Sequence, residues 1–515
     1  MNSQPYTLLS LVAVCISSIG TTLAANTVPT TDHVLIELSV TEAAEKIRRK
    51  EITSTQLTQA LYRRIEANKQ LNAFITLDKN RALEKARQAD RITASGRPLP
   101  PLHGIPLVLK DNIDAIGWPT TAGTPGLLNN YPGQHAPVVD KLIDAGAFIL
   151  GKNNMHELAF GITSDNTHFG SVGNPYNALM TPGGSSGGTA AAIAARMAPA
   201  GLGTDTGGSV RIPPALTGTV GFRPTVGRYS QAGIVPISHT RDTAGPITRT
   251  VEDTILINGI ITDGPTQIEP ADLKTVRLGV PRDYFYQNLD NTSRPVIEEA
   301  LNRLKEQGVT LVAADLPGLH ELNEKIGFPL AIYEVLRDIP KYLDKSQAQI
   351  AFSDVIKQLA SPDVKFVLGE LALGKDGKIG TEDDAIPTQV YQEAVGEHRA
   401  KLQTLYQEYF AKNNLDGMLF PTTLLPARRT AISAKTVDLN GQQVPTFQTY
   451  IHNTDPSSNA GIPGITLPIG MTSSGLPIGL ELDGPADSDE QILAIALSIE
   501  SLFEKLPAPH LSTGE

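Results

Sequence analysis

The sequence contains very little cysteine and no excess of basic residues. The first shortage argues against thiol chemistry, and the second argues against nucleic-acid binding. The only cysteine, Cys15, lies near the N-terminus, so the rest of the chain can form neither a disulfide nor a reactive thiol. Lys and Arg number 43 against 54 Asp and Glu, which gives a net charge of −11. Because nucleic-acid binding depends on clustered cations that neutralise phosphates, we expect no nucleic-acid partner.

The sequence also lacks an apolar run long enough to span a bilayer, because the run Leu8–Ile19 is too short. Small residues follow that run at Thr22, Ala24 and Ala25. This pattern predicts a cleaved signal peptide over residues 1–25, and hence a periplasmic or secreted protein without stable membrane association. No Lys or Arg precedes the apolar run, so a disordered tail or a signal anchor is the alternative interpretation.

Hydrophobic periodicity divides the remaining chain into helical and strand-like parts. Apolar residues recur every three or four positions in three early segments, which predicts helices over Thr41–Lys50, Ser54–Lys69 and Asn80–Thr93. From Pro100 onward, short apolar runs separated by Gly and Pro alternate with helical stretches, which favours a buried sheet covered by helices. Residues 272–412 are mainly helical in pattern, and the strand-like runs GMLFP, GITLPIG and LPIGLELDG follow.

The most unusual stretch is TPGGSSGGTA, residues 181–190, where paired glycines flank two adjacent serines. A nucleoside-triphosphate loop would need Lys after the final glycine, but Thr189 stands there. Gly183, Ser185 and Gly187 satisfy the G-x-S-x-G elbow of a Ser-His-Asp esterase. That elbow requires a strand directly before the serine, and the preceding NPYNALMTP, with two prolines and two asparagines, makes a poor strand.

A zinc-protease helix can be tested at His156-Glu157, where a second histidine would have to stand four positions after the first. Position 160 is Phe, so this metal motif is broken.

A second glycine-flanked serine, Ser209, lies in GLGTDTGGSVRIPP. The turn before it, Thr206-Gly207-Gly208, can direct successive backbone N–H groups at one point and form an anion-binding nest. A hydroxyl beside such a nest is what acyl transfer requires. Lys110 is the candidate base, because it ends the apolar run GIPLVL and burial would lower its pKa. For Lys110 alone, a surface ion pair with the adjacent Asp111 would be the simpler interpretation.

These residues occur together in an order that resembles a known family. The stretches PGGSSGGTAAAIAA and GTDTGGSVRIPPALTGTVGFRPT, together with Lys110, are similar to the signature of the amidase signature family. The similarity extends to GKNNMHELAFG, NPYN, GPITRTVED and NAGIPGITLPIG. The resemblance implies an α/β fold, with one large domain over residues 33–510 whose twisted mixed β-sheet is sandwiched between α-helices. Length alone would favour two or more domains.

The resemblance also implies a catalytic mechanism. Neutral Lys110 would take a proton from Ser185, the serine that follows a cis peptide bond, and Ser185 would take one from the nucleophile Ser209. Four backbone N–H groups would hold the oxyanion, those of Thr206, Gly207, Gly208 and Ser209. Three further residues match positions that support the site, namely Ser186, Asp205 and Arg211. The acyl-enzyme would then be hydrolysed by water, and neither a metal nor an organic cofactor is required.

Two longer stretches, which begin GRYSQAGIVPISHTRDTAG and TFQTYIHNTDPSSNAGIPG, look most similar to the branch of indoleacetamide and mandelamide hydrolases. That branch splits small amides of aryl-substituted acids into acid and ammonia. The export signal also favours an exported peptide C-terminal amidase or a broad-range amidase. Further alternatives are the triad-bearing component of a tRNA-dependent transamidase, a Ser-His-Asp esterase and a non-catalytic binding protein on the same scaffold. A homodimer is compatible with the sequence.

Overall fold

The structure, a computed structural model, describes residues 30–511 except 347, 375–376, 378–380, 382–383 and 430–434. The expected signal peptide, residues 1–25 with Cys15, lies outside the described residues. Among the residues that are described, no helix has both the length and the apolar character needed to cross a membrane.

Within the described residues, eleven strands form one mixed sheet. In spatial order these strands are β1 (Phe74–Leu77), β3 (Phe148–Asn153), β2 (Pro106–Lys110), β4 (Gly201–Asp205), β6 (Thr243–Thr248), β5 (Val220–Arg223), β12 (Gly464–Met471), β13 (Pro477–Asp483), β9 (Gly417–Pro421), β7 (Arg277–Gly279) and β8 (Thr310–Val312). Strand β2 is parallel to both β3 and β4, whereas β4 is antiparallel to β6. A separate hairpin joins β10 (Thr436–Leu439) to β11 (Gln442–Pro445).

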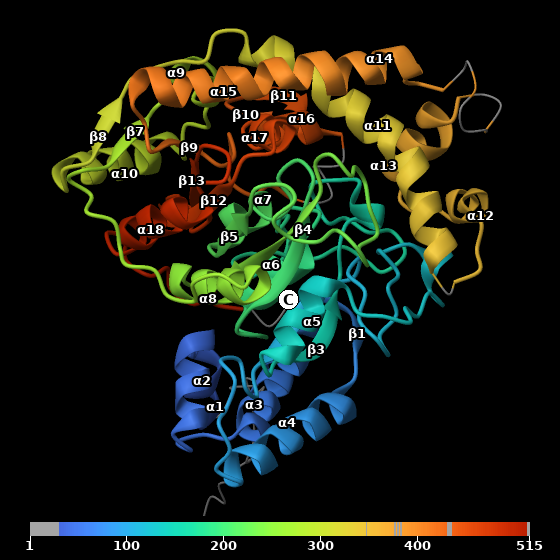
Figure 1. Cartoon of the computed structure of the whole chain (residues 1–515), viewed down its shortest axis with the longest axis vertical. Coiled ribbons are helices and arrows are strands. Elements are labelled where there is room, and N and C mark those ends of the chain that lie inside the picture. The colour runs from blue at the N-terminus through green and yellow to red at the C-terminus, as the bar shows by residue number, and fades with distance from the viewer. Residues whose placement is uncertain are drawn as a thin grey trace, which may run out of the picture.

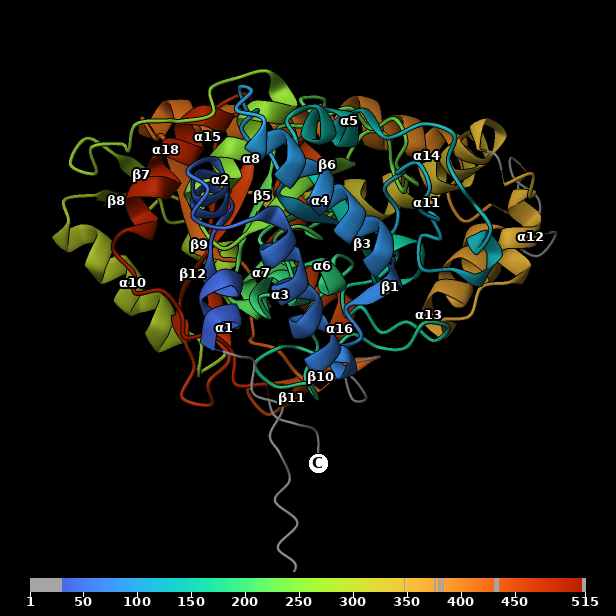
Figure 2. The same cartoon turned by 90° about the horizontal axis from the view of Figure 1, so that it is seen from below.

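Helices surround the sheet. In chain order they are α1 (Thr30–Glu37), α2 (Val40–Arg48), α3 (Ser54–Ala67), α4 (Lys79–Ala94), α5 (Pro137–Asp144), α6 (Gly187–Ala194), α7 (Ile212–Thr217), α8 (Val251–Thr262), α9 (Arg282–Phe285), α10 (Arg294–Glu306), α11 (Leu319–Lys345), α12 (Phe352–Lys357), α13 (Pro362–Val364), α14 (Thr388–Glu393), α15 (Arg399–Asn413), α16 (Thr446–Ile451), α17 (Asp455–Ala460) and α18 (Asp489–Glu500). Figure 1 shows α1–α4 gathered at one end of the molecule and α14 and α15 across the other. Figure 2, seen from below, places α3 and α4 in front of the sheet.

The early helices begin where the sequence provides capping side chains. Ser39 and Glu42 form a capping box at the start of α2, and Thr53 and Gln56 form another at the start of α3. Each box satisfies two backbone N–H groups that a helix would otherwise leave without a partner. The three helices predicted before residue 100 are therefore confirmed as α2, α3 and α4, with ends that differ by a few residues.

The sheet lies between helices, as side-chain alternation along β5 shows. A Cβ built on Gly221 would meet Pro214 of α7. The residues on either side of it, Val220 and Phe222, instead pack in one apolar cluster with Ile255 of α8. Because successive side chains of a strand point to opposite faces, α7 and α8 cover opposite faces of the sheet. The predicted α/β fold, one domain with a mixed sheet between helices, is confirmed.

Topology brings the two signature segments together. Strand β2 ends at Lys110 and its parallel neighbour β4 ends at Asp205. The carboxyl ends of parallel strands meet at the same edge of a sheet, which is the usual position of a binding site in open α/β folds. The other signature segment, the Gly-Ser stretch that contains Ser185, leads into α6, which packs against β2 and β4. This edge of the sheet is therefore the candidate active site.

Candidate active site

Lys110 lies at the end of β2 with its side chain completely buried. Its Nζ is 2.7 Å from Ser185 Oγ, 2.7 Å from Thr204 Oγ1 and 3.3 Å from Thr204 O. Burial lowers the pKa of Lys110 from 10.5 to about 7, although the charges of Asp205 and Asp242 act in the opposite direction. At neutral pH a large share of this amine is therefore uncharged.

Asp111 does not pair with Lys110, which corrects the simpler interpretation of a surface ion pair. Asp111 is completely buried, and its Oδ1 lies 3.2 Å from Nζ of Lys152, a second buried lysine at the end of β3. Thr121 donates both its backbone N–H and its hydroxyl to the other carboxylate oxygen, Oδ2. Because adjacent residues of an extended segment point in opposite directions, Asp111 faces away from Lys110, and in the described part of the chain no carboxylate hydrogen-bonds to Lys110.

Ser185 lies in a loop whose glycines permit close backbone contacts. The peptide bond between Gly184 and Ser185 is cis, and the N–H of His156 donates to Ser185 O at 3.2 Å. A Cβ on Gly188 would lie 2.1 Å from the carbonyl oxygen of Asn154, which no real Cβ tolerates. Gly188, in the first turn of α6, thus lets the end of this loop pack directly against the chain that follows β3.

Ser186, the second serine of the pair, bridges to β4. Its Oγ lies 3.2 Å from the carbonyl oxygen of Thr204 and 3.3 Å from the N–H of the same residue. Ser186 therefore holds the Gly-Ser loop against the residue that contacts Lys110, in agreement with a supporting position.

The residue immediately before Ser185 does not belong to a strand, and Ser185 is followed by the start of α6 at Gly187. No imidazole hydrogen-bonds to Ser185 or Ser209 in the described part of the chain. His156, the histidine whose backbone contacts the loop, directs its ring towards Asp363 and Thr163. The esterase interpretation thus lacks both its strand and its histidine.

Ser209 follows β4 by a tight turn, residues 206–208, and is largely buried. Gly208 adopts a φ of +143°, and a Cβ there would lie 2.1 Å from Thr454 Oγ1. Only glycine fits this position without a clash. Thr454 also donates its hydroxyl to Gly207 O at 2.7 Å, which anchors the middle of the turn. We call residues 206–209 the oxyanion loop.

One of the four expected oxyanion donors is already engaged. The N–H of Gly208 donates to Asp205 Oδ1 at 2.9 Å, and an N–H that is used in this way cannot point at a substrate. Within the described residues, the N–H groups of Thr206, Gly207 and Ser209 have no acceptor. Of the four expected donors, the N–H of Gly208 is therefore occupied in this structure and shapes the loop, and the N–H groups of Thr206, Gly207 and Ser209 are the three that are free to act as predicted.

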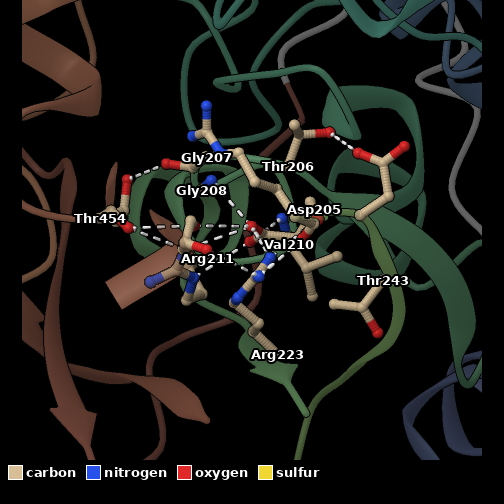
Figure 3. Close-up of polar contacts among 12 residues, drawn as sticks. Asp205, Thr206, Gly207, Gly208, Val210, Arg211, Arg223, Thr243 and Thr454 are labelled. Carbon is tan, nitrogen blue, oxygen red and sulfur yellow. Dashed lines mark hydrogen bonds and ion pairs between the residues drawn. The ribbon is translucent and has the colours of Figure 1, made fainter. Parts of the chain in front are cut away.

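Asp205, at the end of β4, is the centre of a buried network of charges (Figure 3). Its oxygens accept hydrogen bonds from Arg211 Nε at 3.0 Å, Arg223 Nη1 at 2.8 Å and the N–H of Val210 at 3.0 Å. Burial alone would raise the pKa of Asp205, but Arg211 and Arg223 hold it well below its usual range. Arg211 also reaches Glu481 Oε1 on β13 at 2.9 Å. The network ties the oxyanion loop to the far half of the sheet.

Three residues that the sequence analysis did not identify contact this site. Thr204, one position before Asp205 in the same motif, hydrogen-bonds to Lys110, and Asn112 Nδ2 donates to Thr204 Oγ1 at 3.1 Å. Asp242 Oδ1 accepts the hydroxyl proton of Thr206 at 2.6 Å. The position of Thr204 inside a signature stretch was a usable signal, whereas a lone aspartate before a strand carried none.

A cavity of about 230 Å³ opens beside these residues. Its wall includes Thr204, Thr206 and Asp242 from the site, together with apolar and aromatic side chains such as Ile237 and Tyr342. A small, mostly apolar pocket with a few polar groups at one end is typical of a site for a small ligand.

In the described residues, one group of side chains has the composition of a metal site, His239, Glu334 and Asp338 near the cavity. Glu334 Oε2 already accepts three hydrogen bonds, from the hydroxyls of Ser238 and Thr240 and from the N–H of Thr240. His239 Nδ1 lies 2.7 Å from Asp338 Oδ2, and Asp338 raises the pKa of this histidine. An ion-pair network accounts for the group without a metal.

Comparisons with known proteins identify the family of this chain. The model of the family described as Amidase matches residues 56–493. The chain is 42% identical to an indoleacetamide hydrolase of Agrobacterium vitis, over 90% of this chain and 96% of that protein. It is 40% identical to a mandelamide hydrolase of Pseudomonas putida, over 93% and 94% of the two chains.

A solved structure extends the comparison to the fold. The native peptide amidase from Stenotrophomonas maltophilia superimposes with a TM-score of 0.75 and 29% identity, covering 93% of this chain and 99% of the other. A match of the family model over most of the chain, with relatives of similar length, establishes the family. The chain belongs to the amidase signature family and is a hydrolase of carbon–nitrogen amide bonds.

Proposed function

We propose that this protein hydrolyses small primary amides of aryl-substituted carboxylic acids to the acid and ammonia. In this proposal Ser209 is the nucleophile, Ser185 transfers protons and Lys110 is the base. The observation that carries the proposal is the 2.7 Å contact between Ser185 Oγ and the buried Nζ of Lys110, whose pKa burial lowers to about 7. A base whose pKa lies near the working pH is well matched to proton transfer.

The hydrogen bonds of Lys110 support this direction of proton transfer. A neutral amine has two N–H groups and one lone pair. Thr204 supplies two acceptors, its carbonyl oxygen at 3.3 Å and its Oγ1 at 2.7 Å. If both N–H groups point to Thr204, the lone pair faces Ser185 Oγ and can accept its proton. Ser185 can then take the proton of Ser209 as that serine attacks the amide carbonyl.

The remaining steps follow from the same groups. The N–H groups of Thr206, Gly207 and Ser209 stabilise the negative charge that develops on the carbonyl oxygen. Collapse of the tetrahedral intermediate breaks the C–N bond, while Ser185 passes a proton to the leaving nitrogen, which departs as ammonia, and Lys110 returns its proton to Ser185. Water then attacks the acyl-enzyme and gives one proton through Ser185 to Lys110. As the ester bond to Ser209 breaks, this proton passes back through Ser185 to the Ser209 oxygen, which releases the acid and restores neutral Lys110.

Two observations support a small aryl substrate. The relatives named above are an indoleacetamide hydrolase and a mandelamide hydrolase. The cavity beside Thr204 and Thr206, about 230 Å³, is smaller than the roughly 300–1,000 Å³ of pockets for drug-sized ligands. A small amide fits this volume better than a peptide does. The likeness to a peptide amidase keeps amidated peptides as the second candidate.

The test is ammonia release by the purified protein from indole-3-acetamide, mandelamide, short aliphatic amides and C-terminally amidated peptides. We expect the aryl amides to have the highest kcat/KM. Ser209→Ala should reduce turnover by at least about 10³-fold, as removal of a nucleophile does. Ser473→Ala, at an exposed serine in the turn after β12, is the matched control and should retain full activity.

Each outcome has a distinct meaning. Turnover of amidated peptides alone would contradict the substrate class but leave the three catalytic roles intact. Full activity of Ser209→Ala would contradict the mechanism. Lys110→Met should be inactive while His156→Gln remains active, and the reverse would favour a histidine-dependent hydrolase.

We further propose that the protein is exported and that residues 1–25 are removed. The support is the sequence pattern alone, because this segment lies outside the described residues. Edman or mass-spectrometric analysis of the protein from the periplasmic or extracellular fraction should give an N-terminus close to residue 26. An intact N-terminus in the cytoplasmic fraction would contradict export.

A further inference from the structure

Asp242 meets the oxyanion loop because of the register between two strands. Strand β4 ends at Asp205 and β6 begins at Thr243, and these two residues are paired across the antiparallel ladder. Thr206 and Asp242 are the next residues beyond the pair. Thr206 Oγ1 donates to Asp242 Oδ1 at 2.6 Å, so the contact extends the ladder by one side-chain hydrogen bond.

The carboxylate of Asp242 is itself held in place. Its second oxygen, Oδ2, accepts the N–H of Ile237 at 2.8 Å and that of Ser238 at 2.9 Å. Asp242 is 8% exposed and has donors on both oxygens. A carboxylate with three well-placed donors has little freedom to move, and hydrogen bonds to a charged acceptor are the stronger ones. It therefore provides a rigid anchor for Thr206.

The oxyanion loop needs such an anchor at its start. Thr206 is followed by two glycines, the residues with the most backbone freedom. Two other anchors act further along, Thr454 on the carbonyl of Gly207 and Asp205 on the N–H of Gly208. In Figure 3 the Thr206 hydroxyl and the Gly207 carbonyl point in opposite directions, so these anchors hold the loop from two sides.

We propose that Asp242 is a positioning residue for amide hydrolysis: through the Thr206 hydroxyl it fixes the first two free N–H groups of the oxyanion loop. The inference rests on the proposed function of that loop. Asp242 makes no hydrogen bond to Lys110, Ser185 or Ser209 within the described residues, so its hydrogen-bonded route to the reaction runs through Thr206. Its charge also raises the pKa of Lys110, an effect that disappears at a pH where Lys110 is neutral. Donors that stabilise a transition state must be preorganised to within about half an ångström.

The test compares Thr206→Val, which removes the hydroxyl and keeps the shape, with Thr206→Ser, which restores the hydroxyl. A misplacement near 1 Å costs about 100-fold in rate, so we expect Thr206→Val to lower kcat by about 10–100-fold. KM should change less than about threefold, because the interaction is made with the transition state. Thr206→Ser should recover most of kcat.

Asp242→Asn keeps the size of the side chain and removes its charge, so it should lower kcat in wild-type protein. Measured above pH 8, where Lys110 is neutral with or without the Asp242 charge, the same substitution in the Thr206→Val background should have less than about a twofold effect on kcat, because the route through Thr206 is already broken. Equal effects of Asp242→Asn in both backgrounds would overturn the inference, and so would wild-type kcat in Thr206→Val.

A second readout separates this inference from the proposed function. The rate at which a fluorophosphonate labels Ser209, followed by intact mass, reports the loop and the nucleophile without any amide substrate. Labelling should slow in Thr206→Val in parallel with kcat. If wild-type protein is labelled at Ser209 but splits no amide, the proposed function fails; if Thr206→Val is labelled at the wild-type rate, the positioning role fails.

The matched control is a second buried threonine–aspartate pair. Thr225 Oγ1 donates to Asp489 Oδ2 at 2.6 Å, and Asp489 also accepts the N–H of Thr225 at 2.9 Å. This pair joins the segment just after β5 to the start of α18, and among the described residues neither side chain hydrogen-bonds to the oxyanion loop. Thr225→Val repeats the chemical change, so it should alter stability and leave kcat and the labelling rate unchanged.

Discussion

The buried amine of Lys110 predicts how activity depends on pH. Only the neutral amine can accept a proton, and burial lowers the pKa of Lys110 from 10.5 to about 7. The neutral fraction is then about 9% at pH 6, 50% at pH 7 and 90% at pH 8. The value of kcat/KM should thus rise about tenfold from pH 6 to pH 8 and become constant above pH 8. A lysine with the ordinary pKa would be only about 0.03% neutral at pH 7.

The measurement is initial-rate ammonia release at low substrate concentration in buffers from pH 5.5 to 9.5, with unfolding followed in parallel so that loss of fold is not read as titration. A profile that is flat from pH 6 to 8 would refute Lys110 as the base. A profile that still rises above pH 9 would show that the amine keeps its proton, and the argument from burial would fail.

Asp242 titrates near the same pH range, so its effect on the pH profile must be distinguished from that of Lys110. Burial raises the pKa of Asp242 to about 6, although hydrogen bonds from Thr206 and from the N–H groups of Ile237 and Ser238 oppose the shift. The negative charge of Asp242 favours the protonated form of Lys110. Asp242→Asn should therefore move the midpoint of the rising limb to lower pH. A midpoint that moves to higher pH would contradict the assignment of the limb to Lys110.

Two further predictions concern stability. Arg211→Met should lower the free energy of unfolding, measured by urea denaturation, by about 3–5 kcal/mol, because the buried carboxylate of Asp205 loses one of its two cationic partners. An effect below about 1 kcal/mol would show that the network contributes little to stability. Gly188→Ala should destabilise by about 3 kcal/mol, because its Cβ would meet the carbonyl of Asn154 at 2.1 Å. Gly396→Ala, with open space at its Cβ, is the control, and equal melting temperatures for the two variants would contradict the packing argument.

The sequence alone predicted much of the fold because its elements carry local signals. The capping residues before α2 and α3 define where these helices begin, and the apolar runs in β2 and β3 have the pattern of fully buried strands. The pairing of strands is not a local property. The antiparallel register of β4 and β6, which sets Thr206 against Asp242, follows from the way two distant segments twist and pack.

The site, like the fold, has a part that the sequence predicts and a part that depends on tertiary structure. The signature stretches identified Lys110, Ser185 and the oxyanion loop, because a hydroxyl beside flexible glycines, with a strand-end lysine elsewhere, is a pattern of residue types in order. The structure brings Lys110 and Ser185 into contact at 2.7 Å. It also adds Thr204, whose two acceptors orient the lysine.

The sequence by itself determined which residue types and which flexible turns were available for chemistry. Tertiary structure decided how each polar group is used. Asp111 pairs with Lys152 instead of Lys110, and Asp205 accepts the N–H of Gly208 and so occupies one expected oxyanion donor. The chain fixes the residue types. Burial and hydrogen-bond partners depend on segments that are far apart in the sequence and meet only in the folded protein. Burial sets the pKa of a group, and a hydrogen-bond partner occupies a donor.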